Sequence, residues 1–305
     1  MKCMICDRDN IECVETVISD FVMARIEPEF INGKVDNKKV KLCYCRDCTF
    51  AFYDYRFNET ETNRLYDNYR DSEYQKLREK YEYWYTSKVN YMLNSDKLAI
   101  DCQKKGIISA VNRNITSEIK VALDYGGNEG KSFSDQIGTQ EKYVYDISGV
   151  DTIEGVNSIS SIDELKKHSY DFVMCNMVFE HLAVFYPVLD VFHDIGSEET
   201  VYYVEVPSEN PFEKGNKFSI KNNLKLLTRP EINKIKLLRY YIKTKKEPFM
   251  PMKEHINFFT PKSLQYMIEK KNFKIIDCQE MIENSVLGKN TVLYALFKKK
   301  TNIVF

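Results

Sequence analysis

The sequence predicts an α/β protein built on a doubly wound, mostly parallel sheet, and three observations lead to this fold class. After residue 119, short apolar runs of the kind that form buried strands alternate with helical segments. The run at residues 121–125 passes directly into a turn with three glycines, and the next run ends in Asp146. Two CxxC pairs and a long helical stretch precede the sheet.

Length and charge narrow the classes of partner. A chain of 305 residues is long enough for one large α/β domain and a small accessory unit. Its net charge of −1 gives no general affinity for a polyanion, so we do not expect nucleic acid as a partner. The N-terminus lacks the apolar stretch of a signal peptide and no 18-residue apolar run occurs, so we expect a cytoplasmic protein with no membrane partner.

Four cysteines near the N-terminus predict a zinc-binding unit, similar to a zinc ribbon, over residues 1–56. Two CxxC turns can each present two thiolates and together complete the tetrahedral shell of a structural Zn²⁺. The expected ligands are Cys3, Cys6, Cys45 and Cys48. Thiols stay reduced in the cytoplasm, so Cys13 and Cys43, which lie outside the pairs, are expected to be free, with a place among the metal ligands as the alternative.

Residues 57–118 predict a helical linker or lid. The segment is rich in tyrosine, carries charged residues at i, i+3 and i+4 spacing, and has no Gly or Pro before Gly106. An aromatic stripe at helical spacing usually packs against a core, which we expect here, while lining a substrate mouth is the alternative. The tyrosines concerned include Tyr66, Tyr69, Tyr74 and Tyr81.

Residues 119–305 predict a ligand-binding domain of alternating strands and helices. Strands are expected at 121–125, 142–147, 170–178 and 200–207, and helical segments at 132–137, 161–167 and 180–195. A basic helical insertion is expected at about 213–247, with a solvated face as its usual role and contact with a diphosphate as the alternative. Residues 273–278 and 291–297 are expected to form an antiparallel hairpin at the edge of the sheet.

The glycine-rich turn predicts a nucleoside site. Glycines at a strand-to-helix turn let backbone N–H groups approach a ligand, and an acid at the tip of the next strand can accept both ribose hydroxyls. Here the glycines are Gly126, Gly127 and Gly130, and the acid is Asp146. A dehydrogenase should show Gly-x-Gly-x-x-Gly, whereas here Asp124 lies in the strand before the first glycine, which favours S-adenosylmethionine as the ligand.

These residues resemble the class I methyltransferases that use S-adenosylmethionine. Their first motif is an acid followed by spaced glycines, and their fourth strand often leads into Glu-His-Leu; here these elements are LDYGGNEG and CNMVFEHL. The resemblance implies a Rossmann-like, seven-stranded sheet in which the glycines face the methionine part of the cofactor, Asp146 its ribose, and Asn176 with Met177 the sulfonium. The implied cofactor-binding residues are Asp124, Gly126, Gly127, Gly130, Asp146, Ile147, Asn176 and Met177. Asn128 replaces the usual middle glycine, and because asparagine tolerates a positive φ, we expect the turn to keep its shape.

A narrower resemblance is to bacterial methyltransferases with a four-cysteine zinc unit before this sheet and a late Glu-His, an aromatic pair and Thr-Pro. The deoxysugar C-methyltransferases are the best-known members, and the matching element here is EHINFFTP, residues 254–261. Those enzymes normally continue with another large C-terminal domain, which is not found here, so transfer to a sugar oxygen fits as well as transfer to carbon. The resemblance implies a small-molecule acceptor, a sugar or nucleotide sugar; for the chain itself we expect a monomer or homodimer.

Two histidines are the candidate proton acceptors. Methyl transfer from a sulfonium is an in-line displacement that usually needs a base, and histidine titrates near neutral pH. His181 follows the fourth strand and His255 precedes an expected helix start; Glu180 and Glu254 are their neighbours in sequence. We expect His255, His181 and Glu254 to be the catalytic residues. The alternative is that His181 caps the sheet and His255 packs the insertion.

Two other functions stay open. An RNA methyltransferase whose zinc ribbon docks on RNA would need a basic ribbon face, but residues 1–50 mix Lys and Arg with many acidic residues. A non-catalytic protein that binds S-adenosylmethionine is the second alternative. The intact glycines and Asp146 argue against it, because a site without activity need not keep ligand-shaped loops.

Overall fold

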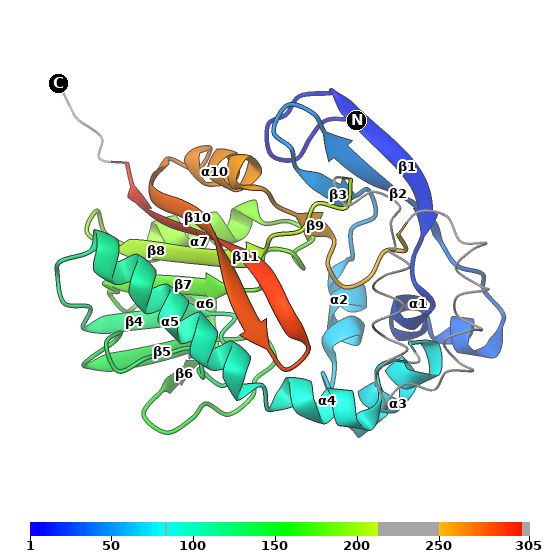
Figure 1. Ribbon diagram of the computed structural model, residues 1–305, viewed down its shortest axis with the longest axis horizontal. Helices are drawn as coiled ribbons and strands as arrows, with labels where there is room; N and C mark the ends of the chain where they lie inside the picture. The colour runs from blue at the N-terminus through cyan, green and yellow to red at the C-terminus, as the bar shows by residue number, and fades with distance from the viewer. Residues whose placement is uncertain (83, 213–249, 301–305) are drawn as a thin grey trace.

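Two β-sheets organise the protein, which we describe from a computed structural model that covers residues 1–82, 84–212 and 250–300 (Figure 1). The basic helical insertion expected at 213–247 lies outside the described residues. The large sheet consists of β4 (Val121–Tyr125), β5 (Glu141–Tyr145), β6 (Asn157–Ile159), β7 (Phe172–Asn176), β8 (Val201–Pro207), β10 (Phe273–Ser285) and β11 (Gly288–Lys299). Its strand order is β10-β11-β8-β7-β4-β5-β6. The predicted α/β fold with a seven-stranded sheet is confirmed.

The centre of the large sheet is parallel. Strand β4 pairs with β5 on one side and with β7 on the other, and β8 continues the parallel arrangement beyond β7. The chain therefore winds in opposite directions from β4, and a ligand site is expected where the carboxyl ends of β4 and β7 meet. The antiparallel hairpin of β10 and β11 forms one edge, as the sequence predicts.

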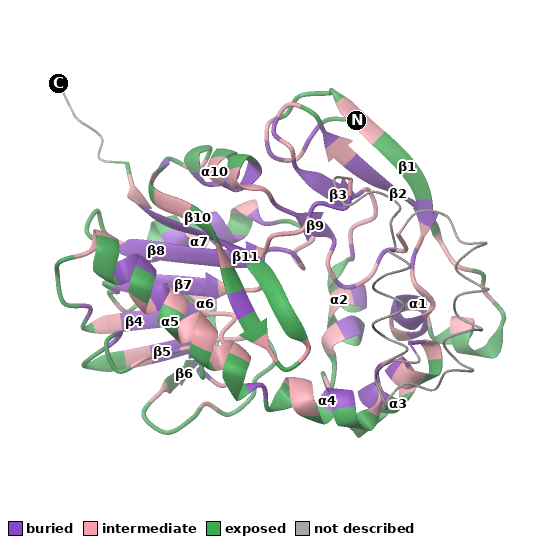
Figure 2. Ribbon diagram, viewed as in Figure 1, coloured by how far each residue is buried: buried purple, intermediate pink, exposed green. Residues whose placement is uncertain are grey.

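Helices cover both faces of this sheet, so strands such as β7 and β8 are mostly apolar and are buried along nearly their whole length (Figure 2). Helix α5 (Lys97–Asn114) packs on one face. Helices α6 (Ile162–Leu165), α7 (Tyr186–Ile195) and α10 (Pro261–Glu269) pack on the other. The helical segment expected at 132–137 is wrong: these residues form turns and irregular backbone, and Gly130 and Gly138 on either side of them both take positive φ.

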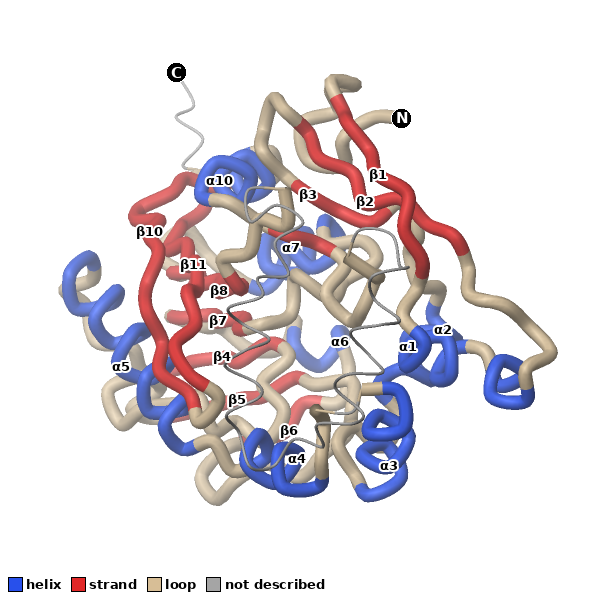
Figure 3. Tube along the Cα trace, turned by 45° about the vertical axis from the view of Figure 1, so that its right-hand side comes forward, coloured by secondary structure: helices blue, strands red, loops and turns tan. Residues whose placement is uncertain are grey.

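The small sheet joins two segments that are far apart in the sequence. It contains β1 (Ile11–Val17), β2 (Lys39–Cys45), β3 (Ala51–Tyr53) and β9 (Asn257–Phe258), in that order. Strand β9 comes from the part of the chain after the large sheet's parallel strands, yet it pairs with β3 (Figure 1). Figure 3 shows β1, β2 and β3 of this sheet apart from the strands of the large sheet. The boundary expected at residue 56 stays a prediction, but the sheet of the N-terminal unit is completed by residues 257–258.

The tyrosine-rich stretch is helical, as predicted, and is divided by N-caps. Helices α2 (Glu59–Tyr66), α3 (Ser72–Tyr81), α4 (Ser87–Asn94) and α5 each begin after a residue whose side chain accepts a backbone N–H; the caps are Asn58, Asp71, Thr86 and Asp96. Helices α2, α3 and α4 share one apolar core with the small sheet and α1 (Asp20–Ile26). Tyr74 lies in this core, so packing is confirmed for that tyrosine. None of the described helices has the length and apolar character needed to cross a membrane.

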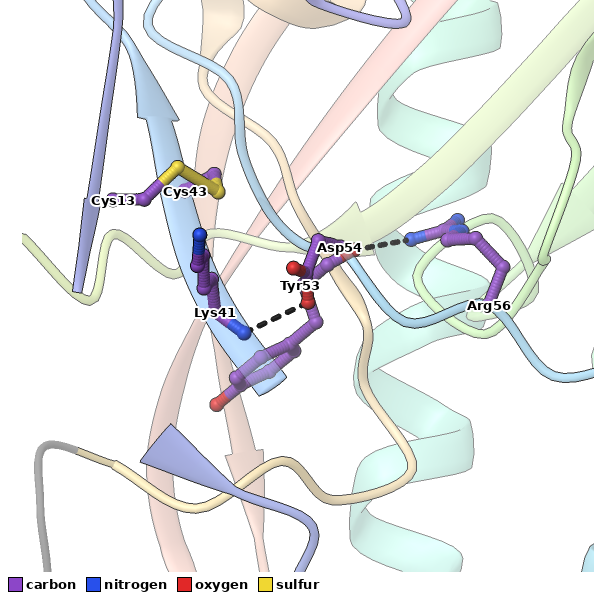
Figure 4. The surroundings of a disulfide bond; sticks show 6 residues. All are labelled: Cys13, Lys41, Cys43, Tyr53, Asp54 and Arg56. Carbon is purple, nitrogen blue, oxygen red and sulfur yellow. Dashed lines mark hydrogen bonds between the residues drawn. A yellow bond between two sulfur atoms is a disulfide. The ribbon is translucent and has the colours of Figure 1, made fainter. Parts of the chain in front are cut away.

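The prediction that Cys13 and Cys43 are free thiols is wrong, because they form a disulfide (Figure 4). The two residues lie directly opposite each other in the antiparallel pair of β1 and β2, a register that brings their side chains together. Sequence spacing alone does not reveal this register. The disulfide also removes both cysteines from competition for a metal ion.

Candidate functional site

The turn after β4 depends on its glycines. The N–H of Gly126 donates to the carbonyl of Tyr145 at 2.7 Å, which holds the turn against β5. Gly126 and Gly130 have φ of 79° and 78°, a region that side chains disfavour. A Cβ at Gly127 would lie 2.4 Å from Cγ of Asp124, so a side chain has no room there.

Asp146 connects this turn to the tip of β5. Its Oδ2 accepts the N–H of Asn128 at 2.9 Å, and its Oδ1 accepts the N–H of Ser148 at 2.8 Å. Asn128 has a φ of 52°, which confirms that it adopts the left-handed conformation expected of it. Each carboxylate oxygen keeps a further lone pair, and the side chain of Ile147 is 73% exposed next to it. The tip of β5 therefore presents the hydrogen-bond-accepting carboxylate of Asp146 beside the exposed apolar side chain of Ile147.

Two side chains near this turn have buried polar atoms without a hydrogen-bond partner among the described residues. Asp124 is 1% exposed and neither of its carboxylate oxygens has a donor; both polar atoms of Asn176 are likewise unpartnered. Burial raises the pKa of Asp124 to about 8, and the charges of Asp146 and Glu205 add to the increase. Leaving such groups unpaired costs about 1–3 kcal/mol each, so they indicate a ligand at the carboxyl ends of β4 and β7.

The turn after β7 is strained. Met177 has a φ of 55°, and its N–H donates to the carbonyl of Glu205 on β8 at 2.9 Å. A left-handed conformation at a residue other than glycine costs on the order of 1 kcal/mol and persists where the surrounding structure enforces it. The two sequence-predicted residues Asn176 and Met177 thus lie at the point where the chain leaves β7.

The structure brings His181 and His255 together, although they are far apart in sequence. Their ring centroids are 4.8 Å apart, and the rings are nearly perpendicular. The carbonyl of Glu180 accepts the N–H groups of Ile256 and Asn257 at 2.8 and 3.1 Å. This pairing fixes the segment before β9 against the loop after β7, which creates the histidine pair.

The partners of the two imidazoles differ. Nδ1 of His181 lies 2.8 Å from the hydroxyl of Tyr66 and 3.1 Å from the carbonyl of Glu254. Nε2 of His181 lies 3.7 Å from Oε1 of Glu180. Nδ1 of His255 lies 3.4 Å from Oε2 of Glu209.

These different surroundings shift the pKa values of the two imidazoles in opposite directions. Burial, together with the positive charge of His255, lowers the pKa of His181 to about 3. Burial also acts to lower the pKa of His255, but the hydrogen bond to Glu209 and the charge of Glu180 outweigh it and raise that pKa above its usual value. Burial raises the pKa of Glu180 to about 7. Of the two imidazoles, His255 is therefore the more basic.

Glu254 uses its carboxylate elsewhere. Oε1 accepts the hydroxyl of Tyr74 at 2.5 Å, and Oε2 lies 3.1 Å from Nη2 of Arg78, with both ionic side chains nearly buried. Arg78 also pairs with Glu82 at 2.7 Å. The carboxylate of Glu254 thus holds α3 in place, while its backbone carbonyl contacts His181, and a catalytic role for Glu254 stays a prediction.

Glu209 is a site residue that the sequence reasoning missed. It follows β8 by two positions, at the same sheet edge as the residues after β4 and β7. A search of every residue that follows a parallel strand would have found it. Tyr66 was recognised only as part of the aromatic stripe.

The four cysteines of the two CxxC turns lie together. Their sulfur atoms are all within 4.8 Å of one another, with Cys3 and Cys48 at 3.4 Å and Cys6 and Cys45 at 3.5 Å. Zinc–sulfur bonds of about 2.3 Å in a tetrahedron place the sulfurs roughly 3.8 Å apart, so this donor set fits a Zn²⁺ ion.

Comparison with known protein families identifies one family for this chain. A family model described as a methyltransferase domain matches residues 69–277, which is more than half of the chain and includes the glycine turn and His255. No curated protein sequence matches the chain.

Solved structures with a similar arrangement have low sequence identity. The 1,6-didemethyltoxoflavin-N1-methyltransferase of Burkholderia thailandensis, solved with 1,6-didemethyltoxoflavin and S-adenosylhomocysteine, is 11% identical over 85% of this chain and 99% of its own, with a TM-score of 0.45. An S-adenosylmethionine-dependent methyltransferase of Methanosarcina mazei is 13% identical over 63% of this chain and 98% of its own, with a TM-score of 0.38.

Proposed function

Because the chain belongs to the methyltransferase domain family, we propose that it transfers a methyl group from S-adenosylmethionine to a small acceptor, a sugar or nucleotide-linked sugar. One observation carries the choice of donor: the buried, unpartnered polar atoms of Asp124 and Asn176 lie next to the glycine turn. An anionic side chain without a donor suits a cationic ligand, and S-adenosylmethionine carries both a sulfonium and an ammonium group.

The residues present fit this donor. Its bound form supplies a methyl group on a sulfonium, which a nucleophile can attack in line. The proposed binding residues are Asp124, Gly126, Gly127, Gly130, Asp146, Ile147, Asn176 and Met177. The open lone pairs of Asp146 would accept the ribose hydroxyls, and the turn at Gly126 and Gly127 allows the close approach of the methionine part.

The cluster of Glu180, His181, His255 and Glu209 is the proposed place where the acceptor loses its proton. Of the two histidines, His255 is the stronger proton acceptor, because Glu209 and Glu180 stabilise its charged form and raise its pKa. His181, neutral and fixed through Nδ1, would orient the acceptor.

Side chains beside His181 support a nucleotide-sugar acceptor. The ring centroids of Tyr66 and Tyr69 are 5.8 Å apart, and Tyr69 is 42% exposed, so an aromatic surface borders the cluster. The guanidinium of Arg70 lies 4.9 Å from the centre of the Tyr69 ring, and its buried Nε has no hydrogen-bond partner within the described structure. A guanidinium suits the phosphate groups of a nucleotide sugar.

We further propose that Cys3, Cys6, Cys45 and Cys48 bind a structural Zn²⁺. A closed shell of four thiolates leaves no position for a substrate, so the ion would stabilise the small sheet and take no part in methyl transfer.

The test has two stages. Calorimetric titration of the full chain with S-adenosylmethionine should show binding, and its absence would contradict the proposal. Cofactor labelled in the methyl group is then incubated with separate pools of nucleotide sugars and RNA. Label in the nucleotide sugars supports the proposed acceptor, whereas label in RNA would overturn it.

His255→Ala should reduce turnover about 100-fold or more while cofactor affinity changes little, since a general base contributes roughly that much. The matched control is His193→Ala, because His193 lies exposed on α7, away from the cluster. Equal turnover in the two variants would remove His255 from the mechanism.

A further inference from the structure

We propose that Glu180, His181 and His255 form a binding site for one divalent transition-metal ion. The metal's role deepens the proposed function and rests on it, because the ion would hold the acceptor's oxygen next to the donor methyl. Within the described residues, this cluster is one of two groups that bring three or more potential metal ligands together, and the other is the cysteine group.

The ligand atoms are close enough to converge on an ion. Each residue offers one imidazole nitrogen or carboxylate oxygen, and the three atoms all lie within 4.8 Å of one another. Nε2 of His181 and Oε1 of Glu180 are 3.7 Å apart. Ligands about 2.1 Å from a metal are roughly 3.0–3.4 Å apart, so no pair of ligand atoms has to close by more than about 1.8 Å, which side-chain rotation can provide.

Both imidazoles have the outer contacts typical of metal ligands. A histidine that binds a metal through one nitrogen usually donates its other N–H to a carbonyl or carboxylate. Nδ1 of His181 lies 3.1 Å from the carbonyl of Glu254, and Nδ1 of His255 lies 3.4 Å from the carboxylate of Glu209. These contacts leave Nε2 of each ring as the metal ligand.

Glu180 supplies the second, independent indication of a ligand. Its side chain is 2% exposed, and Oε2 is a buried oxygen without a hydrogen-bond partner in the described part of the chain. A buried carboxylate without a partner is costly, and a cation between it and the two imidazoles would satisfy it. The neighbouring carboxylate of Glu254 is not available, because Tyr74 and Arg78 hold it.

Two histidines and one carboxylate are a ligand set typical of first-row divalent metals. Three protein ligands leave part of the metal's coordination shell open. The side chains of His181 and His255 are 24% and 37% exposed, so this side of the cluster is accessible. A hydroxyl that occupies an open position has a lowered pKa. With the ion bound, His255 would be a ligand and Glu209 would take its place as the proton acceptor. The hydroxyl's proton would pass to Glu209 and its oxygen would take the methyl group, as the carbon–sulfur bond breaks and its electron pair stays on sulfur.

Metal stoichiometry tests the site without knowledge of the acceptor. The full chain is stripped with a chelator, titrated with Co²⁺, and followed by absorbance and by elemental analysis after desalting. We expect two ions per chain, one with the intense thiolate charge-transfer band of the cysteine group and one without it. His255→Ala and Glu180→Gln should each lose only the ion without that band, whereas His193→Ala should keep both.

Glu209→Gln should weaken binding of this ion about 10–100-fold without removing a ligand. Thermal unfolding and cofactor titration show whether each variant is folded. One ion per wild-type chain, or two ions retained in both ligand variants, would overturn the metal site. If the wild type methylates its acceptor with one ion, the metal proposal alone fails; if it binds two ions but no S-adenosylmethionine, the proposed function fails instead.

Discussion

Replacing Asp124 by Asn should remove the pH dependence of cofactor binding. The carboxyl group is 1% exposed, has no donor among the described side chains, and has a pKa raised to about 8 by burial and by the charges of Asp146 and Glu205. At pH 7 about nine-tenths of the molecules therefore carry a protonated Asp124 before the cofactor binds. Pairing with a cationic group requires the ionised form, so binding must expel this proton.

The sign and size of the effect follow from linkage. When the pH is below the Asp124 pKa of about 8, cofactor binding must release the proton of Asp124, so the affinity for the cofactor falls as the pH falls. Between pH 6 and 7.5, below the range where an α-amino group is largely deprotonated, the dissociation constant should decrease about 20-fold as pH rises. At pH 7 about 0.9 proton should be released per cofactor bound.

Calorimetry in buffers with different ionisation enthalpies measures the released protons directly. Asp124→Asn should show weaker binding, no proton release and a flat pH profile. The control is Asp194→Asn, which removes the same charge from an exposed ion pair with Lys166. If the wild type releases no proton on binding, or if Asp124→Asn releases as many protons as the wild type, Asp124 does not pair with the cationic part of the cofactor.

Three further predictions concern the turn, the helical region and the zinc unit. Gly127→Ala should weaken cofactor binding at least tenfold by calorimetry, because the new Cβ would collide with the Asp124 carboxyl group. Arg78→Met should lower the free energy of unfolding in urea by about 3–5 kcal/mol, because Glu254 loses its buried charge partner. Cys45→Ser should lower zinc content by elemental analysis and reduce the melting temperature, because one of four thiolate ligands is lost.

Each of these variants has a matched control. Gly33→Ala adds a Cβ that would meet no atom within 4 Å at a glycine outside the cofactor turn, and should bind the cofactor normally. Arg46→Ala breaks an exposed pair with Glu12 and should cost less than about 1 kcal/mol. Cys102→Ser should keep its zinc. If a variant and its control change the measured quantity equally, the contact proposed as the cause of that variant's effect is contradicted.

The parts of the site that could be predicted from the sequence are local in the chain. The turn at Gly126 and Gly127 follows its strand directly, and the acid that serves it ends the next strand. Both features depend on backbone geometry within a few residues. The two CxxC pairs are recognisable for the same reason, because each pair forms a single turn.

The parts that could not be predicted depend on how distant segments pair. His181 and His255 meet because the carbonyl of Glu180 accepts two N–H groups from the segment before β9. Cys13 and Cys43 meet because of the register between β1 and β2. Neither pairing has a sequence signal, since register and tertiary contacts arise from packing of the whole core.

Strand β9 has a consequence for the order in which the protein is built. Ala51 of β3 pairs with Phe258, a residue that the ribosome adds about 200 positions later, and closing such a loop costs roughly 5 kcal/mol of chain entropy. Until then the edge of β3 in the partly synthesised small sheet is unpaired. Its free backbone N–H and C=O groups can pair with a strand of another chain, which favours aggregation. Early capture of a metal ion by the four cysteines would protect this fragment during synthesis by holding β2 and its neighbouring turns in place. The zinc unit would thus matter most before the enzyme is complete.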